Sequence, residues 1–155
     1  MFDMASLPCD RDEDKHLIRR LITDYHEHSN QLRYNGLPVV ATFGGQSCRF
    51  GTNHMDDGWT NVVKRDLAPV HFIPSFFIEP PIYEGLKCND GAFSVSHVIL
   101  KTLRRLKISA QWDSGWPVNN ADINSEYDDE YLRYLKGKTY MAGVSPWFFT
   151  VCSFS

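Results

Sequence analysis

Apolar and polar positions along the chain follow two different periods, one typical of helices and one typical of strands. In residues 10–28 the apolar side chains recur every three or four positions, which predicts an amphipathic helix. Asp10 and Glu13 resemble a capping box at its start. A weaker helical pattern covers residues 56–66. The clearest helix is predicted over residues 125–136, where a serine cap and acidic residues come first and a lysine followed by glycine comes last.

Between these helices lie short apolar runs that predict strands over residues 37–43, 70–77, 90–93 and 138–144. Regular alternation of strand and helix predicts an α/β protein with parallel strands and crossover helices. About four such units are present, so the fold is either a small open sheet or part, about half, of a (β/α)8 TIM-type barrel. Because residues 1–4 lack the strand expected before a βα loop and no helix follows the last strand, we expect the barrel to be incomplete at both ends.

The composition fits a soluble globular protein, with 43% hydrophobic residues and a mean hydropathy of −0.35. The net charge of −3 and the isoelectric point near 6.0 give no electrostatic reason to expect a nucleic acid or an anionic membrane as partner. No stretch approaches the ~20 apolar residues of a transmembrane helix. The first eight residues also lack the basic and apolar regions of a signal peptide.

Neither the cysteines nor the histidines predict a metal site. Cys9, Cys48, Cys88 and Cys152 lie far apart and contain no Cys-x-x-Cys pair, so they are either disulfide-bonded or buried thiols. His26 and His28 are two positions apart on a predicted helix and therefore point in different directions. The sequence also contains no glycine-rich nucleotide-binding motif. We therefore expect no metal and no cofactor.

Seven short segments form a recognisable series. They are residues 2–8, 30–36, 40–46, 71–77, 90–94, 115–117 and 140–149. Each segment alone is a weak signal, but their order and spacing across the chain are specific. Together they resemble glycoside hydrolase family 71, the fungal α-1,3-glucanases also called mutanases. The resemblance implies a fold similar to a TIM barrel, secretion to the cell wall, and inverting hydrolysis of α-1,3-glucosidic bonds. It also implies α-1,3-glucan as the partner, without an obligate protein partner.

Two breaks in the resemblance divide the chain. Residues 95–111 interrupt the family pattern with a basic segment that contains no acidic residue. Because Val-Ser can be encoded as an intron donor and Gln as the acceptor CAG, we interpret this segment as an unspliced intron. The alternative is a genuine basic amphipathic helix that contacts a membrane surface or a partner. Residues 151–155 form a second break, a tail unlike the family, so residues 1–150 would be a partial catalytic domain.

Hydrolysis of a glycosidic bond usually needs two carboxylic groups on opposite sides of that bond. Asp3, Glu79, Asp90 and Asp113 lie near the expected carboxyl ends of strands. The resemblance makes Asp3 a supporting catalytic or substrate-orienting carboxylate, whereas the simpler interpretation is a loop residue. It places the family's main acid and base in a Trp-Asn-Asp-x-x-Glu segment, which does not occur here.

We therefore expect this chain alone to be an inactive part of a glucan endo-1,3-α-glucosidase. The alternatives are a non-catalytic α-glucan-binding module and an unrelated intracellular α/β protein. Trp112 and Trp147 are candidates for stacking on glucose rings, and Gln46 and Asp113 for hydrogen bonds to sugar hydroxyls. Plain packing is the alternative for both tryptophans. Trp59 and Tyr25 are expected in the core, and residues 128–130 in a solvated first helical turn.

Overall fold

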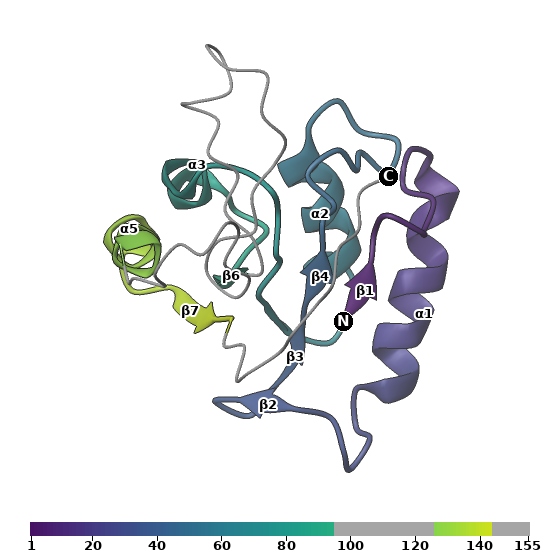
Figure 1. The fold of residues 1–155 in the computed structure, drawn as a ribbon. Helices are drawn as coiled ribbons and strands as arrows, with labels where there is room; N and C mark the ends of the chain where they lie inside the picture. Colours follow the sequence, from purple (N-terminus) through teal and green to yellow (C-terminus); the bar gives the residue numbers. More distant parts are fainter. Residues whose placement is uncertain (95–125, 144–155) are drawn as a thin grey trace, which may run out of the picture.

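The computed structural model describes residues 1–94 and 126–143 of the 155-residue chain. Figure 1 shows the order of its elements, which alternate between strand and helix. They are β1 (Phe2–Asp3), η1 (Asp12–Asp14), α1 (Lys15–Tyr25), β2 (Arg33–Tyr34), β3 (Leu37–Val40), β4 (Thr42–Phe43), α2 (Met55–Val63), β5 (His71–Phe72), α3 (Pro80–Gly85), β6 (Gly91–Ser94), α5 (Glu126–Leu135) and β7 (Thr139–Ala142).

The main strands are parallel and neighbour one another in chain order. β1 pairs with β4, β3 with β5, and β6 with β7, each in parallel. β3 and β4 are one extended run interrupted at Ala41. β6 joins β5 because the Asp90 N–H donates to the Phe72 carbonyl at 2.8 Å and the Phe93 N–H donates to the Pro74 carbonyl at 3.0 Å. The predicted α/β class with parallel strands and crossover helices is therefore confirmed.

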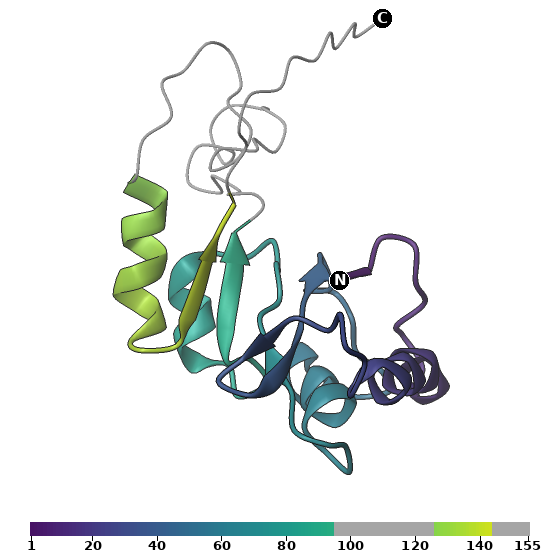
Figure 2. The same ribbon diagram turned by 90° about the horizontal axis from the view of Figure 1, so that it is seen from below.

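One face of this row of strands is covered by the helices, which follow one another around it in Figures 1 and 2. Within residues 1–94 and 126–143, a buried cluster contains residues of α1, α2, α3 and α5 together with residues of the strands. Its helical members are Ile18, Ile22, Trp59, Val62, Val63, Tyr83, Tyr131 and Leu135, and its strand members include Val40, Phe72 and Ala92. Burial of apolar area of this kind is the main source of stability of such a layer.

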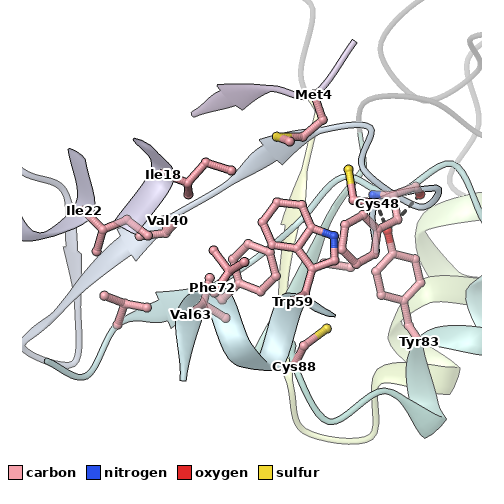
Figure 3. Packing of buried hydrophobic residues seen from close by; sticks show 14 of the residues in the cluster. Met4, Ile18, Ile22, Val40, Cys48, Trp59, Val63, Phe72, Tyr83 and Cys88 are labelled. Atoms are coloured by element: carbon pink, nitrogen blue, oxygen red, sulfur yellow. Dashed lines mark hydrogen bonds between the residues drawn. The ribbon is translucent and has the colours of Figure 1, made fainter. Parts of the chain in front are cut away.

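Trp59 lies at the centre of the cluster, as Figure 3 shows. It is fully buried, and its ring centroid is 5.0 Å from that of Phe50 and 5.2 Å from that of Phe72. The prediction that Trp59 belongs to the core is confirmed, but the same prediction for Tyr25 is wrong. Tyr25 is 53% exposed because it is the last residue of α1, where its ring lies beside that of His28.

Several element boundaries differ from the predicted ones. The capping box at the start of the first helical segment is formed by Arg11 and Asp14, not by Asp10 and Glu13. Its Asp14 carboxylate accepts the Arg11 N–H at 2.8 Å. β1 forms a two-residue strand at residues 2–3, where the sequence was expected to lack one. β2 and α3 were not predicted. The described helices include none that is long and apolar enough to cross a membrane.

Candidate functional site

Parallel strands place their carboxyl ends at one common edge, and in this chain that edge carries Asp3. Asp3 ends β1 and is the register partner of Phe43, which ends β4. The side chain of Asp3 is exposed, and its Oδ1 atom accepts the Ala5 N–H at 3.0 Å. Its own carbonyl accepts the Ser6 N–H at 3.3 Å. These two contacts hold the carboxylate in a tight turn directly after the strand, where it can accept hydrogen bonds from a ligand.

Gln46 lies at the same edge, in the loop that follows β4. Its Oε1 atom accepts the Phe77 N–H at 3.3 Å, so the side chain bridges the loop after β4 and the chain that continues β5. The residue is half-buried. The structure thus brings Asp3 and Gln46, both predicted site residues, to the carboxyl ends of two adjacent strands.

The turn that presents Gln46 is fixed by close packing. Gly45 has a φ of +105°, and a Cβ atom there would lie 2.9 Å from the Trp59 ring and 3.2 Å from Met4. Only glycine therefore fits this position. The Gly45 carbonyl accepts the Trp59 Nε1–H at 2.9 Å, and the Gln46 carbonyl accepts a hydrogen bond from the Arg49 guanidinium at 3.2 Å. Backbone and core together hold the Gln46 side chain in place.

A disulfide between Cys9 and Cys48 ties the loop after β1 to the loop after β4, with their Cα atoms 5.0 Å apart. Beside it, the Arg49 N–H and Phe50 N–H donate to the Cys9 carbonyl at 3.0 and 2.8 Å. The sequence left the pairing of the cysteines open. Cys88 is a buried thiol whose pKa is raised, first by burial and then by its hydrogen bond to the Asp56 carboxylate. Cys152 lies outside the described residues.

Each polar residue of this edge has a phenylalanine as neighbour: Phe43 is the register partner of Asp3, and the Phe77 N–H donates to Gln46. Phe43 and Phe77 are half-buried, and their rings meet edge to face at a centroid distance of 5.1 Å. Sequence reasoning did not single them out because each lies in an apolar run that was interpreted as a buried strand. A signal was available in the alternation of side chains along a strand, because successive residues point to opposite faces. Phe43 therefore faces away from the side on which Thr42 is fully buried.

Glu79 lies in the loop that follows β5 and thus on the carboxyl side of that strand, as predicted, whereas Asp90 does not share the position of Asp3. Asp90 precedes β6 and thus lies at the amino end of that strand, which corrects its assignment to a carboxyl end. Its Oδ2 atom accepts the Phe72 N–H at 2.8 Å and pairs with the Lys64 ammonium, so it connects β5, α2 and β6. Glu79 is the residue before α3. Asp90 therefore has a structural role in the sheet.

A polar network closes the other end of the edge, beyond β6. The Tyr140 hydroxyl lies 2.7 Å from Ser94 Oγ and also hydrogen-bonds the Asp128 carboxylate. Burial, followed by the neighbouring Asp128, raises the pKa of the Tyr140 hydroxyl, so it stays protonated at neutral pH. Asp128 is half-buried, which corrects its prediction as a purely solvated residue of the first helical turn.

Trp112, Asp113 and Trp147 lie outside the described residues, and their predicted contacts with sugar remain predictions. Over residues 1–94 and 126–143, no three side chains of the His, Cys, Asp or Glu type lie close enough together to hold a metal ion. The candidate site of the described part of the chain therefore consists of Asp3 and Gln46, with Phe43 as the register partner of Asp3 and Phe77 hydrogen-bonded to Gln46.

Comparison with known proteins extends this picture. The profile of the family described as Glycosyl hydrolase family 71 matches residues 1–155. The chain is 33% identical over 161 residues to Glucan endo-1,3-alpha-glucosidase agn1 of Schizosaccharomyces pombe, covering 99% of this chain and 32% of that protein. It is 30% identical over 138 residues to Mutanase Pc12g07500 of Penicillium rubens, covering 88% of this chain and 26% of that protein.

A second Schizosaccharomyces pombe protein, named Ascus wall endo-1,3-alpha-glucanase, is 28% identical over 137 residues. The chain spans about a third of the length of these curated relatives or somewhat less. No solved structure matches it. Because the family profile covers the whole sequence, the chain belongs to glycosyl hydrolase family 71.

Proposed function

We propose that the protein carrying these residues hydrolyses α-1,3-glucosidic bonds, and that the edge with Asp3 and Gln46 forms part of its glucan-binding cleft. Three relatives are named for this activity or as a mutanase. The observation that carries the proposal is the position of Asp3 and Gln46 at the carboxyl ends of adjacent parallel strands, with a disulfide between their two loops. Ligands of α/β enzymes bind at such edges.

The strand order supports the further proposal that the described elements belong to a (β/α)8 barrel. In such a barrel each parallel strand neighbours the next one in sequence, and helices cover the outer face. The described strands and helices have this arrangement.

Residues 1–150 would then be part of the catalytic domain, with residues 95–111 as an insertion. Genomic DNA whose codons at Val95 or Gln111 differ from intron borders would exclude the intron interpretation.

The proposed mechanism is inverting acid–base hydrolysis, in which two carboxyl groups stand roughly 6.5–9.5 Å apart and leave room for a water molecule. Asp3 would be a supporting carboxylate that orients substrate or water. Trp112 and Trp147 would stack on sugar rings, and Asp113 would bind hydroxyls. Because the 155 residues contain no Trp-Asn-Asp-x-x-Glu segment, we propose that this polypeptide alone binds glucan without cleaving it.

We further propose that the protein is secreted. The Cys9–Cys48 disulfide supports this, because disulfides persist in oxidising compartments and are rare in the cytosol. Recovery of the oxidised protein from the culture medium is the expected result. Recovery of the reduced protein from the cytosol alone would contradict secretion.

Co-sedimentation with insoluble α-1,3-glucan tests the proposed function. We expect the polypeptide to be retained on α-1,3-glucan, not on β-1,3-glucan, and to release no reducing sugar. Asp3→Ala should weaken retention, whereas Asp24→Ala, at an exposed position of α1, should not. Equal retention of the wild type on both glucans would contradict the proposed site. Equal retention of Asp3→Ala and the wild type on α-1,3-glucan would contradict it as well. Release of reducing sugar would contradict the proposed lack of cleavage.

A further inference from the structure

The direction in which Gln46 can donate hydrogen bonds is fixed by its neighbour Phe77. A backbone N–H can only donate, so the atom of the Gln46 amide that faces the Phe77 N–H at 3.3 Å has to be the oxygen. The amide nitrogen therefore points to the opposite side of the planar group. Unlike most glutamines at a protein surface, this side chain has a defined donor end and a defined acceptor end.

The donor end faces away from the contacts that hold the residue. Within residues 1–94 and 126–143, the contacts of Gln46 are made by its Oε1 atom and by its backbone carbonyl, and the Nε2 atom has no hydrogen-bond partner. The residue is half-buried at the carboxyl edge. An amide NH2 group with two N–H donors is thus held at an edge where the ligands of parallel α/β folds bind.

We propose that Gln46 donates a hydrogen bond from Nε2 to an oxygen of the bound glucan, an assignment that rests on the proposed function of this edge. The loop presents the amide in a single orientation, because the Trp59 indole and the Arg49 guanidinium hold the carbonyls of residues 45 and 46. Binding then costs little additional side-chain entropy.

Asp3 complements Gln46 because its carboxylate accepts hydrogen bonds, while the Gln46 nitrogen donates them. A sugar hydroxyl does both, so an acceptor and a donor on adjacent strand ends suit a glucose unit. Two half-buried phenylalanines neighbour these polar groups, since Phe43 is the register partner of Asp3 and the Phe77 N–H donates to Gln46. The combination favours a neutral polyhydroxylated ligand over an anionic one, since Asp3 would repel an anion.

Two substitutions separate the donor from the structural contact. Gln46→Glu keeps the shape and the oxygen that accepts the Phe77 N–H, but its carboxylate donates nothing at neutral pH. Gln46→Met removes both functions. We would measure the Kd of an α-1,3-linked glucose oligosaccharide by calorimetry at pH 7 and at pH 4, with wild type at each pH as reference. Ser47→Ala, at the exposed neighbouring position, is the matched control.

We expect Gln46→Glu to weaken binding about 2- to 12-fold at pH 7, as for the loss of one hydrogen bond. The deficit should shrink at pH 4, because a carboxyl group with an ordinary pKa of about 4.3 is then about two-thirds protonated and donates again. Gln46→Met should stay weak at both pH values, and Ser47→Ala should match wild type.

If Gln46→Glu binds the oligosaccharide as tightly as wild type at pH 7, the donor role of Gln46 Nε2 is overturned, whereas the proposed function of the edge stays in place. A deficit of Gln46→Glu that is equal at both pH values would also overturn it, since the loss would then not follow the donor. Absence of wild-type binding to the oligosaccharide would instead refute the proposed function itself.

Discussion

The disulfide between Cys9 and Cys48 should supply a large part of the stability of the candidate site, because it joins the two loops that carry Asp3 and Gln46. The perturbation is the double substitution Cys9→Ala and Cys48→Ala. Alanine suits position 48, which is fully buried, because it introduces no unpaired polar group. The cross-link closes a loop with a sequence separation of 39. The chain-entropy relation converts this loop into about 4 kcal/mol at 25 °C.

The hydrogen bonds from Arg49 and Phe50 to the Cys9 carbonyl remain in the double variant, so the two loops should still meet in the folded state. We expect a loss of about 2–4 kcal/mol in the free energy of unfolding. With a urea slope of about 2 kcal/mol per molar, the midpoint of unfolding should fall by about 1–2 M.

Urea unfolding followed by circular dichroism measures this loss. Reductant should lower the wild-type midpoint to that of the double variant and leave the variant unchanged, since its remaining described cysteine, Cys88, is a buried free thiol. A loss below about 0.5 kcal/mol, within the range of ordinary surface substitutions, would show that the disulfide contributes little to stability and would contradict this prediction. An oxidised wild type that does not respond to reductant would do the same.

Three further predictions concern the stability of the fold. The Arg19 guanidinium donates hydrogen bonds to three carbonyls at the end of α2, at 2.6, 2.7 and 2.8 Å. Arg19→Ala should therefore lower the free energy of unfolding, measured in urea, by about 1–3 kcal/mol. Arg20→Ala, at an exposed position, should change it by less than about 0.5 kcal/mol. Gly45→Ala introduces a methyl group at φ +105° against Trp59 and should lower the free energy of unfolding by about 2–4 kcal/mol. The near-ultraviolet circular dichroism spectrum should also change. An unchanged spectrum and an unchanged melting temperature would contradict the packing of Gly45 against Trp59. Burial lowers the pKa of His71, so the unfolded chain binds its proton more tightly, and stability should decrease as the pH falls from about 7.5 to about 5.5. His71→Gln should reduce this pH dependence, and an equal slope in both proteins would count against it.

Long periodic segments of this chain are predictable from sequence, and short ones are not. α5 and strands β3 to β7 were located from their apolar patterns, whereas β1 and β2 were not. The six residues of α3 are too few to show a helical period. The two-residue strand β2 forms a hairpin with β3 through Asn35 and Gly36, both with positive φ. An Asn-Gly pair is a strong hairpin signal, but the strand on its first side is only two residues long.

The candidate site was predictable where it depends on strand ends, and not where it depends on contacts between loops. Gln46 follows the apolar run 37–43 after two glycines, so its position at the carboxyl edge follows from parallel topology, whereas the role of Asp3 was expected from the resemblance to the family. The pairing of Cys9 with Cys48 required knowledge that two loops meet in space. Asp90 was wrongly assigned to the carboxyl end of a strand. It directly precedes Gly91, the first residue of β6, and side-chain patterns do not resolve such a boundary.

The central claim, that the carboxyl edge binds α-1,3-glucan, is tested most directly by amide hydrogen exchange with and without an α-1,3-linked glucose oligosaccharide. We expect slower exchange upon binding at residues 3–6 and 44–46, and no change at residues 33–37, which lie in the hairpin at the amino end of β3. Slower exchange confined to residues 33–37, or no change anywhere in a complex shown by calorimetry to form, would contradict it.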